Sequence, residues 1–267
     1  MTTTLTTITH TLDCHGKPIR VLPLADLHLG DAHCDRGLIL ATLEAVMQDD
    51  NLYVILDGDL MNSAIVGSKS DVYGETMSPA AQLEECTRLF QPLADAGKIL
   101  AILPGNHEER ISKSVGVDMT RILARQLGIE HLYSPTSAVI FLKFGVRHRR
   151  RAEGRPMVYS IYVTHGYGGG GRRAGGKVNA LEDLSRIVDA DIYVMGHTHQ
   201  PASFRRGHYV CSHSACAATY HEMVFVNTAA YLTYPGSYGD RMGYAPSSTI
   251  APIITLCDTE HQVRVTV

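Results

Sequence analysis

Short apolar runs that stop at aspartate, asparagine or histidine are the feature of this chain that most restricts its fold. The runs lie at residues 19–24, 52–56, 99–103, 158–164 and 192–195. Each is long enough for one strand, and each is rich enough in Val, Ile or Leu to be buried on both faces. Buried parallel strands that end in polar loops are typical of α/β proteins, in which the loops at the carboxyl ends of the strands form the ligand site.

The stretches between these runs have helical spacing, which supports an α/β fold. Helices are predicted over residues 38–47, from Pro79 onward, over 117–127 and over 181–188. A chain of 267 residues with 45% hydrophobic and 19% charged residues is typical of a folded globular protein. We therefore expect one domain over residues 1–267.

Composition also excludes several classes of protein. No apolar run approaches the roughly 20 residues that a membrane helix needs, and residues 1–9 are rich in Thr rather than forming an export signal. The six cysteines have no paired spacing, which favours reduced thiols and a cytoplasmic location without membrane insertion. A net charge of −3 argues against a surface coated with positive charge, although local basic patches could still meet phosphate. The oligomeric state stays open.

The polar residues that follow the five runs form a set of potential metal ligands. They are Asp26, His28, Asp59, Asn106, His165, His197 and His199. Carboxylate, amide and imidazole groups suit borderline or harder divalent ions, so we expect two such ions, with Mn²⁺ first and Fe, Zn, Co or Ni as alternatives. Asp59 is the natural ligand to share between them.

In order and spacing, these motifs resemble the calcineurin-like metallophosphoesterase superfamily. The motifs are D-x-H, G-D, G-N-H-E, H-G and G-H-x-H, between residues 26 and 199. The chain is similar to compact bacterial and phage members that resemble DNA-repair exonucleases. The resemblance implies a four-layer αββα sandwich with a dinuclear metal site at the carboxyl edge of the sheets. It implies one metal held by Asp26, His28, Asp59 and His199, and a second held by Asp59, Asn106, His165 and His197.

The same resemblance implies phosphoester hydrolysis by a metal-bound hydroxide, with His107 and the bridging Asp59 as catalytic residues. His107 follows a ligand without needing to be one, so its imidazole is available for a phosphoryl oxygen or a leaving group. Glu108 stands where many superfamily members have Asp. We expect its carboxylate to orient the His107 imidazole without binding a metal itself.

The substrate is less constrained than the metal site. A phosphodiester, including nucleic acid, is the first expectation, because basic residues follow His165 in a glycine-rich segment at 168–177. Arg172, Arg173 and Lys177 are its candidate phosphate-binding side chains. The alternatives are a phosphomonoester, or a small molecule such as a nucleotide or a sugar-lipid pyrophosphate. A non-catalytic scaffold is the remaining hypothesis.

A further group of cysteines and histidines lies near the C-terminal third of the chain. It comprises Cys211, His213, Cys216 and His221. Their spacing fits no common structural zinc site, so we expect these side chains to pack as ordinary strand residues.

Overall fold

Two β-sheets face each other in the computed structural model, which describes residues 4–68, 70–147, 155–167 and 174–267. One sheet has the strand order β1-β5-β6-β7-β9-β8, and the other has the order β11-β10-β2-β3-β4. The first comprises β1 (Thr6–Thr11), β5 (Ser137–Arg147), β6 (Arg155–Thr164), β7 (Ile192–Met195), β8 (Ala202–Ser212) and β9 (Ala217–Asn227). The second comprises β2 (Ile19–Leu24), β3 (Leu52–Asp57), β4 (Ile99–Leu103), β10 (Ile253–Leu256) and β11 (Val263–Thr266).

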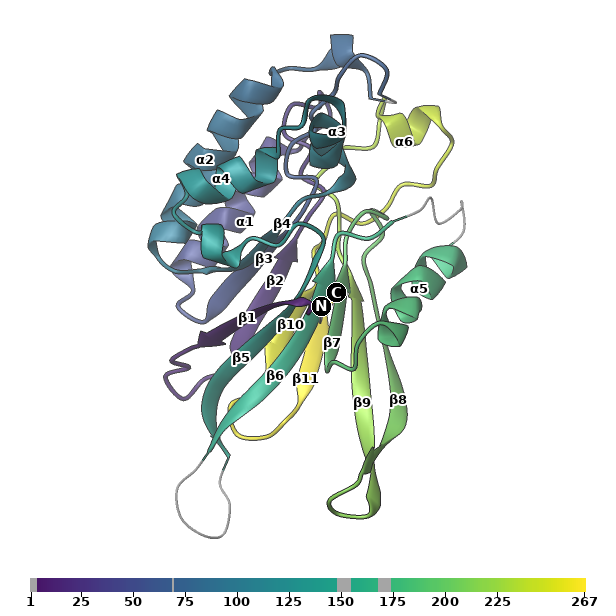
Figure 1. The fold of residues 1–267 in the computed structure, drawn as a ribbon. Helices are drawn as coiled ribbons and strands as arrows, with labels where there is room; N and C mark the ends of the chain where they lie inside the picture. The colour runs from purple at the N-terminus through teal and green to yellow at the C-terminus, as the bar shows by residue number, and fades with distance from the viewer. Residues whose placement is uncertain (1–3, 69, 148–154, 168–173) are drawn as a thin grey trace.

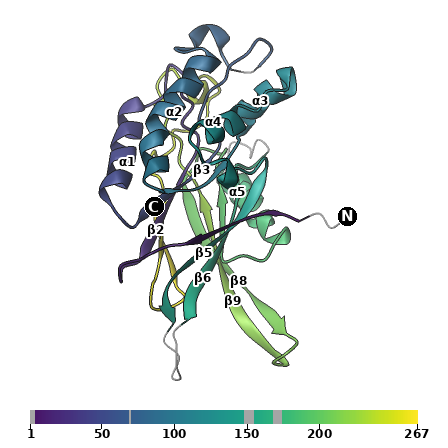
Figure 2. The ribbon, with the colours of Figure 1, turned by 60° about the vertical axis from the view of Figure 1, so that its left-hand side comes forward.

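Helices lie on the outer face of each sheet and in the loops beyond the ends of the strands (Figures 1 and 2). They are α1 (Arg36–Gln48), α2 (Pro79–Asp95), α3 (Asn106–Val115), α4 (Met119–Gln126), α5 (Ala174–Glu182) and α6 (Tyr238–Arg241), with 3₁₀ turns η1 (Val72–Gly74), η2 (Glu130–Leu132) and η3 (Asp183–Arg186). Helix α1 packs on β3, α4 packs on β4, and α5 packs on β7 and β9. This order of layers confirms the αββα sandwich.

Strands β2, β3, β4 and β7 form where they do because both of their faces are buried. Val21 and Ile55 of one sheet belong to the same apolar core as Ile161 and Val194 of the other. A second cluster, which includes Tyr193 and Phe225 on the opposite face, packs against Leu181 of α5. Strands covered on both sides have no polar alternation, which is why they read as continuous apolar runs.

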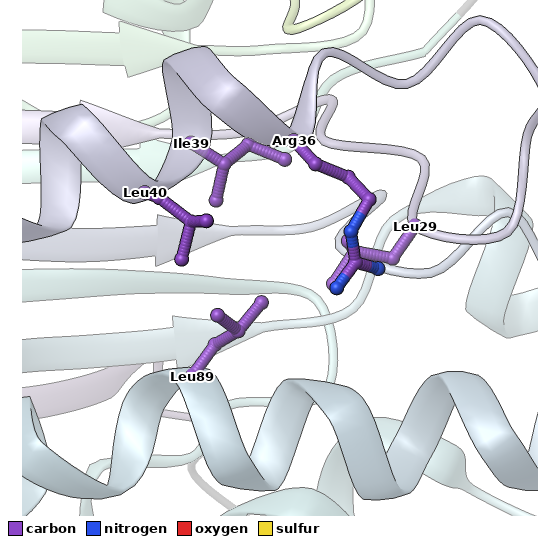
Figure 3. A pocket seen from close by; sticks show the side chains of 5 residues that line it. All are labelled: Leu29, Arg36, Ile39, Leu40 and Leu89. Carbon is purple, nitrogen blue, oxygen red and sulfur yellow. The ribbon is translucent and has the colours of Figure 1, made fainter.

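Helix α2 begins where the sequence predicts. The Ser78 hydroxyl accepts a hydrogen bond from the backbone N–H of Ala81, and Pro79 occupies the first helical position. Its buried face lies beside α1 across a small hollow (Figure 3). Leu29, Arg36, Ile39, Leu40 and Leu89 line this hollow, and Arg36 pairs with Glu85 of α2.

Two sequence expectations need correction. Helix α3 was not predicted, and it begins at Asn106 inside the expected loop. The helix expected over 181–188 is instead α5, which begins at Ala174 and is continued by η3 to Arg186. The strand ends that carry the polar clusters are shared between the two sheets, with β2, β3 and β4 in one and β6 and β7 in the other.

Within the described part of the chain, no helix combines the length and the apolar character needed to cross a bilayer.

Candidate metal centre

Five of the predicted ligands have a backbone conformation that is uncommon for residues other than glycine. Asp26, His28, Asp59, His197 and His199 have φ values of 56°, 48°, 50°, 65° and 54°. Such conformations cost on the order of 1–3 kcal/mol each, and they gather at functional sites where the surrounding structure enforces them. Backbone hydrogen bonds supply that support, because Asp26 N donates to Gly58 O at 3.1 Å and His28 N donates to Asp59 O at 2.9 Å.

Two glycines allow the loops after β3 and β4 to touch. A Cβ atom at Gly105 would overlap the Asp59 carboxylate, and one at Gly58 would overlap the backbone of Gly105. The close approach lets the backbone N–H of His107 donate to Asp59 Oδ1 at 2.8 Å. This bond fixes one carboxylate oxygen of Asp59 and leaves Oδ2 directed toward the histidines.

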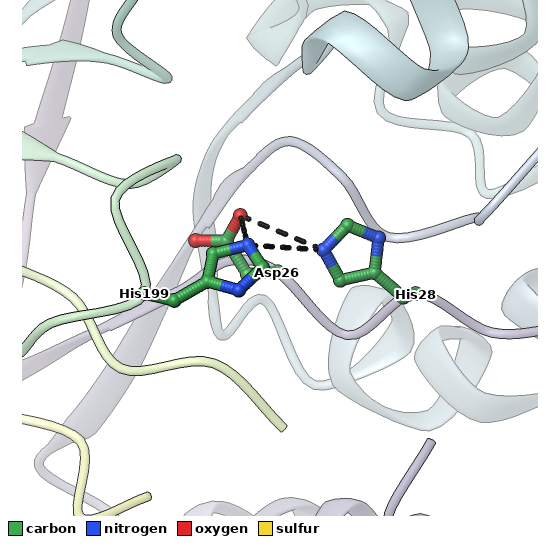
Figure 4. A group of neighbouring side chains, drawn as sticks. All are labelled: Asp26, His28 and His199. Atoms are coloured by element: carbon green, nitrogen blue, oxygen red, sulfur yellow. Dashed lines mark hydrogen bonds and ion pairs between the residues drawn. The ribbon is translucent and has the colours of Figure 1, made fainter. Parts of the chain in front are cut away.

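The first group of ligands joins the loops after β2 and β7 (Figure 4). His199 Nε2 lies 3.2 Å from Asp26 Oδ1 and 3.2 Å from His28 Nε2, and His28 Nε2 lies 3.9 Å from Asp26 Oδ1. Asp26 is fully buried and its Oδ2 accepts from the His197 backbone N–H at 2.9 Å. Three donor atoms therefore converge on one point.

The second group joins the loops after β3, β6 and β7. His165 Nε2 lies 3.2 Å from Asp59 Oδ2, and His165 Nδ1 donates to the Asp57 carbonyl at 2.6 Å. The bond at Nδ1 fixes the tautomer, so that Nε2 presents its lone pair to the site. His197 has a ligand atom within reach of both Asp59 and His165, and its ring lies 5.5 Å from that of His165.

The chemistry of both groups fits divalent cations. The facing Nε2 atoms of His28 and His199 need a proton or a cation between them, and Oδ1 of Asp26 and Nε2 of His165 are buried without a hydrogen-bond partner among the described residues. Burial lowers the pKa of His28 well below its usual value, and it also lowers the pKa of His197, which keeps these imidazoles neutral, as metal ligands must be.

The carboxylates stay ionised even though they are buried. Burial alone would raise the pKa of Asp59, but His165 and His107 hold it well below the ordinary value. Burial alone would lower the pKa of His165, but Asp59 and Asp26 raise it well above the ordinary value. In the metal-free chain His165 thereby supplies positive charge that a cation would otherwise bring.

His107 stands beside both groups. Its Nδ1 bonds to the Asn62 backbone carbonyl at 2.9 Å, and its Nε2 lies 3.8 Å from Asp59 Oδ2. Its ring is in edge contact with the ring of His28, with the centroids 4.4 Å apart. Burial lowers the pKa of His107, so its protonated form is a stronger acid than a histidine in water.

Glu108 has a different role from the one expected. Its carboxylate accepts from the backbone N–H groups of Gly105, Asp59 and Met61 at 2.8, 3.0 and 2.8 Å, whereas His107 is oriented by Asn62. Glu108 therefore joins the start of α3 to the loop after β3. Burial, together with the nearby Asp59 charge, raises the pKa of Glu108 to about 7.

The basic segment after His165 is only partly described. Arg172 and Arg173 lie outside the described residues. Lys177 was expected in a loop, but it lies on α5, where its Nζ donates to the Thr198 carbonyl at 3.0 Å. Lys177 thus holds the loop that carries His197 and His199.

Three supporting residues were not found from the sequence. Asn62 orients His107, as described above. Asn227 ends β9, and its amide donates to the Thr198 hydroxyl and, at 2.6 Å, to the Gln200 carbonyl. Arg110 of α3 is half-buried near His107 and donates to Ser70 Oγ at 2.7 Å. The position of Asn227 at a strand end was the one available signal.

A pocket of about 180 Å³ opens beside the second group. Its lining residues are Pro104, Gly105, Asn106, Glu109, Thr136, Thr164, His165 and Gly166. Asn106 stands at the first position of α3, exposed toward this pocket. The described lining residues are mostly polar, and apart from His165 their one charged group is the Glu109 carboxylate.

Comparison with known proteins adds a family match. A family model described as calcineurin-like phosphoesterase matches residues 20–201. A solved structure described as a predicted phosphoesterase from Streptococcus pneumoniae is 13% identical, with 93% of this chain and 88% of that chain covered and a TM-score of 0.37. Vps29 from Entamoeba histolytica complexed with zinc is 12% identical, with 93% and 97% covered and a TM-score of 0.36. The search of curated proteins found no match.

Proposed function

We propose, from the premise that the chain belongs to the calcineurin-like phosphoesterase family, that it hydrolyses phosphodiesters at the centre formed by the loops after β2, β3, β4, β6 and β7. The observation that carries the proposal is the convergence of two ligand groups with one histidine beside them. The groups are Asp26, His28 and His199, and Asp59, His165 and His197, with His107 next to both.

Two divalent ions are proposed for this centre, and Mn²⁺ is the first to test because the ligands mix carboxylate and imidazole. Asp59 would be shared, since it falls within reach of His28 and His107 as well as of His165 and His197. Asn106 would complete the second group from the start of α3. When bound, such ions polarise the phosphoryl group and lower the pKa of the attacking water.

The protein's own residues do the remaining work. Asn62 holds His107 through Nδ1, so that Nε2 would face the substrate and, when the imidazole carries a proton on both nitrogens, could give the Nε2 proton to the leaving oxygen. Glu108 keeps the loops after β3 and β4 in register, and Asp59 receives its fixed orientation from the His107 N–H. Lys177 and Asn227 hold the loop between His197 and His199.

The charge and size of the pocket support a diester rather than a monoester. A phosphodiester carries one negative charge and a phosphomonoester up to two, and the lining residues within the described part of the chain include Glu109 but no Lys or Arg. Its volume of about 180 Å³ accommodates a phosphate with a short stretch of substrate. Most small-molecule sites enclose roughly 300–1,000 Å³. We therefore propose that most of the substrate lies outside the pocket, as a nucleic-acid strand would.

A side-by-side assay tests the proposal. The protein would be loaded with Mn²⁺ and given a chromogenic phosphomonoester, the matching diester, single-stranded DNA and double-stranded DNA. We expect the diester to be hydrolysed with a higher kcat/KM than the monoester, and DNA to be cleaved. The Asp59→Asn variant is the matched control, because it loses the carboxylate that both ligand groups share, and activity that survives in it does not come from this centre.

Each other outcome has a defined meaning. Faster hydrolysis of the monoester would contradict the diester assignment and favour a phosphomonoesterase. Turnover of the chromogenic diester without cleavage of DNA would favour a small-molecule substrate. Binding of metal without turnover of any of the four substrates would favour a non-catalytic scaffold.

A further inference from the structure

A second cluster of histidine and aspartate lies at the opposite end of β7 from the candidate metal centre. His208 of β8 and His221 of β9 face each other across the antiparallel ladder, and Asp189 precedes β7. His208 Nε2 lies 3.5 Å from Asp189 Oδ1, and His221 Nδ1 lies 3.2 Å from the same oxygen. The cluster shares no residue with the centre at the carboxyl end of β7.

We propose that His208, His221 and Asp189 form a separate Zn²⁺ site. Tetrahedral zinc binds imidazole nitrogen and carboxylate oxygen at about 2.0–2.2 Å, which places neighbouring donor atoms roughly 3.3–3.5 Å apart. The distances of 3.2 and 3.5 Å in this cluster match that spacing, and the three donor atoms all lie within 4.8 Å of one another. A water molecule would take the fourth position.

Hydrogen bonds behind His221 favour a metal ligand. His221 Nε2 lies 3.1 Å from Asp191 Oδ1, and Asp191 Oδ2 accepts from the backbone N–H and the hydroxyl of Ser160, both at 2.7 Å. An imidazole that donates one N–H to a fixed carboxylate presents its other nitrogen as a lone pair, as metal-binding histidines commonly do. That nitrogen, Nδ1, faces the Asp189 oxygen, so two acceptor atoms meet and a cation between them would satisfy both.

The backbone that carries the two histidine donors is regular. The pairing of His208 with His221 lies inside an uninterrupted register between β8 and β9. The Val224 N–H donates to the Asp191 carbonyl at 2.9 Å, which ties the start of β7 to β9. Sites built on strands are held more rigidly than sites on loops. The His208 and His221 side chains are 39% and 25% exposed, so a cation can enter from solvent.

A zinc-content measurement on the full chain tests the site. Wild type, Asp189→Ala and His208→Gln would be stripped with chelator, dialysed against the same free Zn²⁺ concentration and assayed for zinc per chain. We expect each variant to hold one zinc fewer than wild type, whatever amount the centre at the other end of β7 binds. His213→Gln, in the turn of the same hairpin, is the matched control and should hold as much zinc as wild type.

Two further measurements keep the test decisive. Zinc should raise the melting temperature of wild type by more than that of Asp189→Ala, and melting curves in chelator should show that the variants are folded. Asp189 is exposed, so its replacement decides the question even if His208→Gln does not fold. Equal zinc contents in wild type and Asp189→Ala would overturn the proposal.

Discussion

The two ends of β7 carry the same types of residue in opposite surroundings. At the carboxyl end, the side chains of Asp26, Asp59 and His165 are 0%, 1% and 4% exposed. At the amino end, Asp189 is 54% exposed and His208 is 39% exposed. A buried carboxylate must be balanced by a proton or a cation, whereas an exposed one is stabilised by water. Binding of a cation should therefore stabilise the folded protein more at the carboxyl end, where the carboxylates are buried, than at the amino end, where they are exposed.

The backbone conformation of the ligands also differs between the two ends. Five of the seven predicted ligands at the carboxyl end occupy left-handed conformations in loops that hydrogen bonds hold in place. His208 and His221 at the amino end lie in regular extended strands. Strain at the first end indicates a site shaped for reaction, while the regular ladder at the second indicates a site that binds without needing distortion.

Replacement of Asp59, the ligand shared by both groups, should give the largest difference in metal binding between the two ends of β7. Asp59→Asn should lose bound metal at the carboxyl end and reduce turnover below detection, because both ligand groups lose their common carboxylate. Zinc bound at Asp189 and His208 should be unaffected. Metal content and kcat would be measured together, and full activity in this variant would refute the role of Asp59.

His107→Gln should have the next largest effect. It removes a proton donor and leaves the ligands in place, so kcat should fall by roughly 10²–10⁴-fold while metal content stays at the wild-type level. Steady-state kinetics and elemental analysis on the same preparation check this. Parallel loss of metal and rate would instead make His107 a ligand, as its position near His28 and Asp59 would allow.

The free-energy cost of burying an ionised carboxylate can be measured at Glu108 in the metal-free chain. Its pKa is raised to about 7, so the folded state binds the proton more tightly than the unfolded state. The stability that Glu108 contributes relative to Glu108→Gln is therefore greatest below about pH 4.5 and decreases up to about pH 7, by on the order of 3 kcal/mol. Urea unfolding of both proteins in chelator across this range measures it. A difference that does not change with pH would contradict the protonation of Glu108.

Ser160→Ala should have the smallest effect of these substitutions. It should affect only the zinc site at the amino end of β7. Loss of the Ser160 hydroxyl, which orients Asp191, should weaken zinc binding at this site by roughly tenfold. Losses of this size are typical when a residue that hydrogen-bonds and orients metal ligands is removed. Zinc titration would show this, with phosphoesterase turnover as the control that should not change. A loss of turnover would mean that the two ends are not independent.

The sequence predicted the parts of this molecule that depend on local order. The strands at 19–24, 52–56 and 99–103 were evident because both of their faces are buried, and the ligand motifs follow them directly. Helix α3 was missed because its sequence is mostly polar and only Glu108 and Ile111 are buried. A single domain over residues 1–267 stays a prediction.

Long-range pairing explains most of the remaining differences. The family resemblance implied two sheets, but nothing local indicates which strands share a sheet, so the placement of β2, β3 and β4 in one and of β6 and β7 in the other was not predicted. The cluster at the amino end was missed for the same reason. His221 was considered with the neighbouring Cys211 and Cys216, whereas its partners, His208 and Asp189, come to it through strand register.

The central claim is that the carboxyl end of β7 holds a dinuclear metal centre. Anomalous diffraction from crystals loaded with Mn²⁺ tests it most directly. We predict two peaks about 3.5–4 Å apart, one against Asp26, His28 and His199 and the other against His165 and His197, with the Asp59 carboxylate between them. A single peak, no peak, or an Asp59 carboxylate that touches neither ion would contradict this account.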